Sequence, residues 1–203
     1  MKRALSISLL LFTSFVCLQA NAAFMNGSFE EFGMQTPPGV NSFTAYSTLP
    51  GWTSEDSIEI HYTGFIADAQ DGTYYAELNA DPAQATPFAL TQTFDTNGIT
   101  AFTLSFWAQA RLSNDGSFFV SAGDDVIMEE ISSHVVGSWT EYVLNFAVAG
   151  PQATITFLSG QSGKDTVGHF LDNISVKPVP LPGALVMLAG GILGLGLFRR
   201  REA

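Results

Sequence analysis

The stretch Phe102-Thr103-Leu104-Ser105-Phe106-Trp107-Ala108-Gln109 alternates apolar and polar side chains with a period of two. Successive side chains of an extended strand point to opposite faces, so the even-numbered residues would face a core and the odd-numbered residues would face away from it. Shorter runs with the same alternation lie on both sides of it, at 58–62, 74–78, 142–148 and 154–157. This pattern predicts β-strands rather than helices.

Turn-forming residues separate these runs. Thr96-Asn97-Gly98 and Ala149-Gly150-Pro151 each lie between two alternating stretches, and Asn, Gly and Pro are the residues that turns favour. No stretch within residues 23–177 keeps a helical period for more than a turn or two. Many short strands in a segment of this length predict one all-β domain, a β-sandwich.

The charge balance of the chain is strongly acidic. The 203 residues include 8 Lys and Arg against 19 Asp and Glu, a formal net charge of −11. Residues 23–177 hold 18 of these acids and only three cations, Arg111, Lys164 and Lys177, which gives this segment a net charge of −15. Such a surface repels phosphate backbones, so we expect no nucleic-acid binding, whereas calcium would suit it.

The N-terminus has the features of a secretory signal peptide. Two basic residues precede the apolar run Ala4–Leu18, and Ala20-Asn21-Ala22 supplies the small-x-small pattern of a cleavage site. The alternative, a transmembrane helix, would need a longer apolar span. We therefore predict a signal peptide over residues 1–22 and export of the protein, which leaves it without a thiol because its single cysteine, Cys17, lies in that peptide.

The C-terminal segment, residues 178–203, has three parts in order. Val179-Pro180-Leu181-Pro182 precedes an uncharged stretch at 184–198, and a basic cluster follows, made of Arg199, Arg200 and Arg201. This order resembles the PEP-CTERM sorting signal of Gram-negative bacteria, with Leu181 in place of the Glu of the Val-Pro-Glu-Pro box. The resemblance implies a transmembrane helix over 184–198, processing by an exosortase-type transpeptidase, and transient anchoring in the inner membrane before delivery to the cell surface or the extracellular matrix of a biofilm. The alternative is a permanent single-span anchor.

Three different groups of short motifs lie along the middle of the chain. They are Asn26-Gly27-Ser28-Phe29-Glu30 with Leu49-Pro50-Gly51-Trp52, the stretch 71–78 with 90–94, and the stretch 137–142 with 170–176. Their order resembles the galactose-binding-like jelly rolls, among them the carbohydrate-binding modules that accompany xylanases and cellulases. The resemblance implies a jelly-roll β-sandwich that binds carbohydrate without catalysis.

The same resemblance implies a structural calcium ion with Glu30 and Asp172 as ligands, completed by backbone oxygens near Gly27 and Ser28. Asp172 interrupts an otherwise apolar stretch, where a lone buried carboxylate is costly unless it is paired or bound to a metal. The alternative is a carboxylate that is solvated or hydrogen-bonded to backbone amides.

Exposed aromatic rings are the candidates for carbohydrate binding, because sugars stack their apolar faces on such rings while polar groups bind their hydroxyls. The stretch 103–111 would place Trp107, Gln109 and Arg111 on its polar face. Tyr75 belongs to a similar out-facing set, and Trp52 would serve from an end loop. Each ring would otherwise pack in the core.

Catalysis has little support in the sequence. The histidines at 61, 134 and 169 are scattered, and the His-Glu-x-x-His, Gly-x-Ser-x-Gly and phosphate-loop motifs are missing. We therefore expect a non-catalytic protein that binds extracellular polysaccharide and meets a membrane through its C-terminal helix before processing. The alternative is a structural extracellular-matrix protein with no specific glycan ligand.

Overall fold

The computed structural model describes residues 24–78, 87–112, 117–123, 129–131, 135–162 and 167–180. The predicted signal peptide lies outside these residues, as do most of the predicted sorting tail, Pro182 and the cluster of Arg199, Arg200 and Arg201. Val179 and Pro180 are described and are exposed at the end of the last strand. In the ranges that the structure covers, no helix has the length and apolar character needed to cross a membrane.

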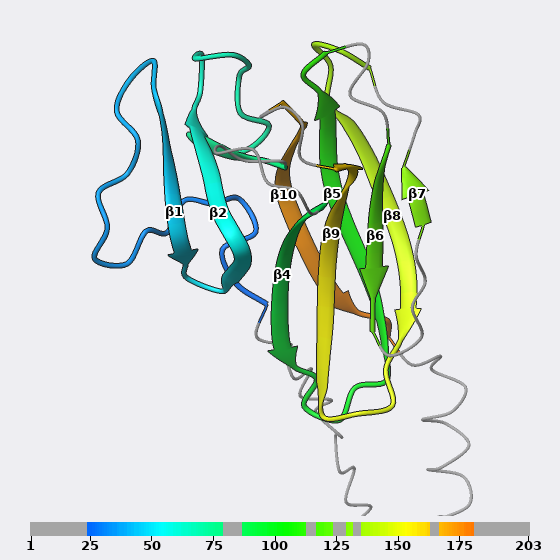
Figure 1. Cartoon of the computed structure of the whole chain (residues 1–203). Helices are drawn as coiled ribbons and strands as arrows, with labels where there is room; N and C mark the ends of the chain where they lie inside the picture. The colour runs from blue at the N-terminus through cyan, green and yellow to red at the C-terminus, as the bar shows by residue number, and fades with distance from the viewer. Residues whose placement is uncertain are drawn as a thin grey trace, which may run out of the picture.

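The regular elements of the described ranges are all strands, which confirms the all-β prediction (Figure 1). In chain order they are β1 (Phe43–Leu49), β2 (Trp52–Tyr62), β3 (Tyr74–Glu77), β4 (Pro87–Asp95), β5 (Ala101–Ala110), β6 (Phe118–Ala122), β7 (Glu129–Ile131), β8 (Thr140–Ala147), β9 (Gln152–Ser162) and β10 (His169–Pro178).

The strands pair antiparallel in the order β7-β6-β9-β4-β2-β3-β10-β5-β8, with β1 added on β2. The long strand β2 joins the two halves of this strand order. Thr53, near the start of β2, pairs with Thr91 of β4, whereas the segment 59–62 near its end pairs with β3. Figure 1 shows β4, β6 and β9 lying in front of β10, β5 and β8 as two layers. The predicted β-sandwich is therefore one continuous sheet folded over β2.

The core lies between these two layers. On β5, the even-numbered residues Phe102, Leu104, Phe106 and Ala108 are all completely buried, as the alternation predicts. The ring of Phe106 contacts Phe157 of β9 at a centroid distance of 5.1 Å. Each fully buried ring of this kind stabilises the fold by about 1.5–3 kcal/mol relative to an exposed one, so aromatic packing accounts for much of the attraction between the layers.

The opposite face of β2 and β3 differs from the prediction. Glu59, His61, Tyr75 and Glu77 alternate with core residues, so the sequence indicates exposed positions, but all four side chains are buried. The loop over 63–73 covers this face, and the backbone N–H of Ala67 donates to the Tyr75 hydroxyl at 3.0 Å. Period-two alternation identifies the two faces of a strand, but it does not show whether a loop covers the second face.

The two ends of the described chain lie at the same end of the sandwich. The ring of Phe24 packs edge-on against Phe94 at 5.8 Å, and Phe94 packs against Phe102 at 5.7 Å. Phe102 in turn pairs with Pro178 of β10, and the N–H of Val179 donates to the carbonyl oxygen of Ala101, the residue before Phe102. Phe24 and Val179 are therefore linked through Phe94 and Phe102.

Candidate functional site

The predicted sugar-binding strand presents one large aromatic side chain to the surface. Trp107 is partly buried on the face of β5 opposite the core, and its backbone pairs with Asp172 on β10 and Glu141 on β8. We call this surface the Trp107 face and define it by the exposed or partly buried residues that share its side of β5, β8 and β10, namely Ala101, Thr103, Ser105, Trp107, Glu141, Val143, Asn145, Ala147, Ser175 and Lys177. It combines one indole ring with hydroxyl, amide, carboxylate and ammonium groups and a few small apolar side chains.

The two polar residues predicted beside Trp107 are engaged elsewhere. Gln109 is buried, and Arg111 is bound to Glu77, with its Nη1 atom 2.9 Å from both carboxylate oxygens. The side chain of Arg111 is 25% exposed. The structure therefore separates Trp107 from the polar partners that the sequence places on the same face.

Trp52 and Tyr75 are corrections to the predicted aromatic set, because both rings are completely buried. The Trp52 Nε1 atom donates to the carbonyl oxygen of Asn26 at 2.8 Å, and the ring packs against Phe29 at 5.4 Å. The ring of Tyr75 packs against Phe170 at 4.9 Å. A completely buried ring has no face to present to a sugar.

The predicted calcium ligand Glu30 anchors a loop. Its Oε1 atom accepts hydrogen bonds from the backbone N–H groups of Thr73 and Tyr74, at 2.6 and 2.8 Å. The same carboxylate lies where a side chain at Gly72 would begin, and the φ of Gly72 is 71°, in the left-handed region that glycine adopts readily.

Asp172, the second predicted ligand, is fully buried and anchors the same loop. Its Oδ2 atom accepts from the N–H groups of Gln70 and Asp71 at 2.8 and 2.9 Å, and its Oδ1 atom accepts from its neighbour Asn173. Burial raises the pKa of Asp172 to about 7, against the opposing effect of these three amides.

The contacts of Glu30 and Asp172 correspond to the alternative in which both carboxylates are hydrogen-bonded to backbone amides. Calcium needs six to eight oxygen ligands, whereas the carboxylates of Glu30 and Asp172 accept hydrogen bonds from backbone N–H groups. Among the described residues, neither acid belongs to a group of three potential metal-binding side chains. Calcium at this position remains a prediction.

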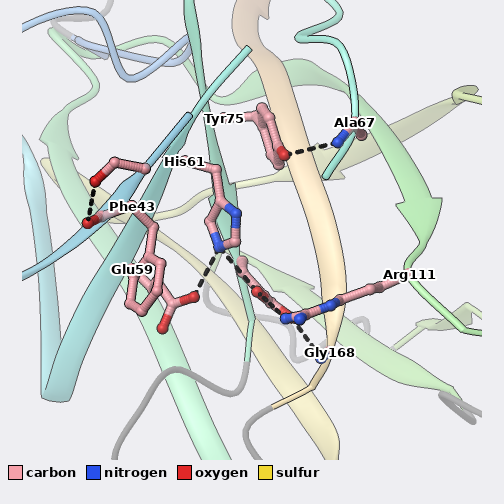
Figure 2. A network of polar contacts seen from close by, with 9 residues as sticks. Phe43, Glu59, His61, Ala67, Tyr75, Arg111 and Gly168 are labelled. Carbon is pink, nitrogen blue, oxygen red and sulfur yellow. Dashed lines mark hydrogen bonds and ion pairs between the residues drawn. The ribbon is translucent and has the colours of Figure 1, made fainter. Parts of the chain in front are cut away.

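A buried polar cluster lies on the covered face of β2 and β3, and it is formed by Glu59, His61, Glu77 and Arg111 (Figure 2). The Nε2 atom of His61 lies 2.7 Å from Oε1 of Glu59 and 2.9 Å from Oε2 of Glu77. The Gly168 N–H donates to Oε1 of Glu77 at 2.9 Å. Strands β2 and β3, the residue that follows β5 and the segment that precedes β10 thus meet at this cluster.

Aromatic rings enclose the imidazole of His61. Phe43 and Tyr75 stack on it at centroid distances of 5.5 and 5.2 Å, and Phe65 and Phe170 approach at 5.6 and 5.5 Å. The other ring nitrogen, Nδ1, has no hydrogen-bond partner in the part of the chain that the structure describes. The ring therefore has apolar walls and one polar edge, which faces the two carboxylates.

The cluster shifts the pKa values of its members. Burial lowers the pKa of His61, but the hydrogen bonds and charges of Glu59 and Glu77 outweigh burial, so the net pKa lies above the ordinary value. Burial raises the pKa of Glu77 although His61, the Gly168 N–H and Arg111 oppose it. An imidazolium held by two carboxylates is the protonation state that this arrangement favours.

The sequence alone does not predict this cluster. The histidines are scattered along the chain, and the signal that Glu59 and His61 share a face lay in their period-two spacing. Only the register, in which Glu59 pairs with Glu77 and His61 pairs with Tyr75, brings the second carboxylate to the imidazole, and that register cannot be read from one strand alone.

Comparisons with known proteins give a fold-level likeness. No protein family and no curated protein matches the chain. Among solved structures, the carbohydrate-binding module TmCBM61 in complex with beta-1,4-galactotriose aligns with a TM-score of 0.46 at 15% identity, covering 77% of this chain and 98% of that chain. A CBM4 structure aligns with a TM-score of 0.44 at 15% identity over 77% of this chain and 100% of that one. A family 35 module from Clostridium thermocellum aligns with a TM-score of 0.45 at 10% identity, covering 68% of this chain and 99% of that chain.

Proposed function

We propose that this protein is an exported, non-catalytic module of the galactose-binding-like jelly-roll type that binds an extracellular polysaccharide through the Trp107 face. The observation that carries the proposal is the position of Trp107, a partly buried residue on a sheet face whose exposed side chains are mostly polar. Of the three rings predicted to bind sugar, Trp52 and Tyr75 are buried, so Trp107 is the one left with an accessible surface.

The chemistry of the Trp107 face suits a sugar ring. The apolar face of a pyranose would stack on the indole, and hydroxyl and amide groups nearby would bind its hydroxyls. Ser105 precedes Trp107 by two residues on the same face, and the side chains of Thr103 and Asn145 already form a hydrogen bond of 2.8 Å across β5 and β8. This pairing holds both polar groups in fixed positions on the same face, four residues along β5 from Trp107.

The net charge narrows the class of polysaccharide. Residues 23–177 carry a net charge of −15, and Glu141 lies beside Trp107 on the binding face. An anionic polysaccharide would be repelled at long range. We therefore propose a neutral polysaccharide as the ligand.

Delivery and calcium complete the proposal. Residues 1–22 would direct export, and residues 178–203 would hold the protein in the inner membrane until an exosortase-type transpeptidase delivers it to the cell surface or extracellular matrix.

A calcium ion near Glu30 and Asp172 would tie the N-terminal segment to β10. If EDTA leaves the melting temperature of the purified protein unchanged, the calcium part of the proposal is wrong.

Affinity electrophoresis tests the binding function. The purified protein would migrate through native gels that contain neutral or anionic polysaccharides, and we expect retardation by a neutral one. Trp107→Ala should abolish this retardation, whereas Met34→Ala, a control at a fully exposed residue (105%) away from the face, should keep it. Unchanged retardation of Trp107→Ala would contradict the site. If no polysaccharide retards the wild-type protein, the structural matrix role replaces the binding function.

A further inference from the structure

We propose that Glu59, His61 and Glu77 form a binding site for a divalent transition-metal ion such as Zn²⁺. This site is separate from the Trp107 face, and the proposal does not depend on polysaccharide binding. The two glutamates and the histidine are all buried, and each of them offers one potential ligand atom. Figure 2 shows the Glu59 carboxylate beside the imidazole of His61.

The ligand atoms have nearly the spacing that a metal requires. One carboxylate oxygen from each glutamate and the Nε2 atom of His61 lie within 4.8 Å of one another. The two carboxylate oxygens lie 2.7 and 2.9 Å from Nε2. Ligands of a tetrahedral zinc ion, at bond lengths of about 2.0–2.2 Å, are separated by about 3.4 Å. The ion would therefore need the two carboxylate oxygens to move away from Nε2 by about 0.5–0.7 Å.

The hydrogen-bonding capacity of His61 supports a metal at this point. Nε2 carries at most one hydrogen, yet two carboxylate oxygens lie within hydrogen-bond distance of it. One hydrogen shared between two acceptors makes two poorly aligned bonds, whereas a metal ion binds Nε2 and both oxygens directly. Because Nδ1 has no partner among the described residues, the polar interactions of this buried ring depend on its Nε2 edge.

The groups around the ligands match the outer shell of a metal site. Ligating carboxylates are usually held by further hydrogen bonds, and Glu77 has two such donors, Nη1 of Arg111 and the N–H of Gly168, each at 2.9 Å from Oε1. The stacked rings of Phe43 and Tyr75 fix the plane of the imidazole. The metal would enter a site whose ligands are already positioned.

The donor set selects the kind of metal. One imidazole nitrogen and two carboxylate oxygens suit zinc and the other first-row divalent ions, whereas calcium and magnesium prefer shells of oxygen alone. Two buried carboxylates with one guanidinium leave a charge of −1 when His61 is neutral, and a divalent ion turns this into +1. Binding would displace a proton from Nε2, so a metal and a proton compete for the same nitrogen.

The test is metal binding by the full-length protein after dialysis against EDTA. We expect one Zn²⁺ per chain in a competition titration with a chromogenic chelator, a rise in melting temperature with Zn²⁺ and not with Ca²⁺, and a Co²⁺ absorption spectrum that indicates nitrogen and oxygen ligands. His61→Gln and Glu59→Gln should each weaken Zn²⁺ binding by more than the roughly 10–100-fold that loss of an outer-shell partner costs. Glu141→Gln, which changes an exposed acid outside the cluster, should bind as the wild type does.

Two outcomes would overturn the proposal. The first is a wild-type chain that binds no stoichiometric Zn²⁺, and this outcome would define the cluster as an ion-pair network completed by a proton. The second is Zn²⁺ binding that both cluster variants retain, which would place the ion elsewhere. If His61→Gln does not fold, Glu59→Gln and the Co²⁺ spectrum of the wild-type protein give the same decision.

Discussion

Gly27 and Ile174 are joined backbone to backbone. The N–H of Ile174 donates to the carbonyl oxygen of Gly27 at 2.9 Å, and the carbonyl oxygen of Ile174 occupies the space where a side chain at residue 27 would begin. Ile174 lies at an irregularity of β10, where the pairing with β5 shifts register between Asp172 and Ser175, and Asn173 adopts a φ of 48°. This contact fastens the N-terminal segment to the last strand.

Gly27→Ala should therefore destabilise the protein. The new methyl group would meet backbone atoms of Ile174 rather than a flexible side chain, so we expect the free energy of unfolding to fall by about 3 kcal/mol. Urea denaturation measures the change. Gly39→Ala is the matched control, because a side chain there meets no atom within 4 Å, and its stability should equal or slightly exceed that of the wild type. Equal effects of the two substitutions would contradict this account of Gly27.

Trp52 and Trp107 should respond differently to removal of the indole. Trp52→Ala empties a fully buried position and should lower the free energy of unfolding by about 3–5 kcal/mol. Its remaining folded fraction should still be retarded by the polysaccharide. Trp107→Ala, at a partly buried residue, should cost less stability and abolish retardation. Urea denaturation and affinity electrophoresis of both variants make the comparison, and loss of retardation by folded Trp52→Ala would contradict it.

Glu77→Gln should destabilise the protein even without a metal. The carboxylate is buried and binds His61 and Arg111, so its neutralisation leaves two cationic groups without their shared partner. Removing one member of a buried ion pair costs about 3–5 kcal/mol. Denaturation in EDTA measures the loss, with Glu141→Gln as the surface control expected to stay within about 0.5 kcal/mol of the wild type. A loss as small as that of the control would show that the cluster contributes little to stability.

The metal-free protein should lose stability as the pH rises above neutrality. The pKa of His61 in the folded state lies above its ordinary value of 6.5. A raised folded-state pKa contributes stability that is fully present below pH 6.5 and disappears as the pH passes the folded-state value. The groups that face the imidazole are Glu59 on β2 and Glu77 on β3, with Arg111 beyond Glu77.

Urea midpoints in EDTA above pH 7 measure this effect. The pH range above 7 excludes most of the contribution of Asp172. Because its pKa is raised from 3.8 to about 7 in the folded protein, Asp172 makes the protein less stable as the pH rises from 3.8 to neutrality, and this change is largely complete at pH 7. His61→Gln should make the profile above pH 7 flatter. An equally steep profile in that variant would assign the pH dependence to another group.

Local sequence patterns predicted the strands and turns well. The alternation along β5 identified its core face residue by residue, and Thr96-Asn97-Gly98 forms the predicted turn, with φ values of 52° and 79° at Asn97 and Gly98 and an Ile99 N–H bond to Thr96. These features depend on the side-chain period of a strand and on the preference of Asn and Gly for positive φ, both of which are local properties.

The candidate sites depend on contacts between distant segments, and the sequence predicted these less well. Tyr75 and Glu77 have the spacing of exposed residues, but the loop over 63–73 and Arg111 cover them. The sequence correctly indicates that the carboxylate of Asp172, which interrupts an apolar strand, needs polar partners. Those partners are the backbone amides of Gln70 and Asp71, about a hundred positions earlier, and no local pattern specifies them.

The shared position of Phe24 and Val179, at the two ends of the described chain, has a consequence for how the protein would be displayed. Phe24 and Val179 lie near the Trp52 end of β2, whereas His61 lies nine residues further along this strand, which is about 30 Å of extended chain. If the protein were tethered through either of these two ends, the domain would stand in the same orientation. The Glu59–His61–Glu77 cluster would then lie at the end of the domain away from that surface. The Trp107 face would lie along the side of the domain, where polysaccharide chains that extend away from the surface could reach it.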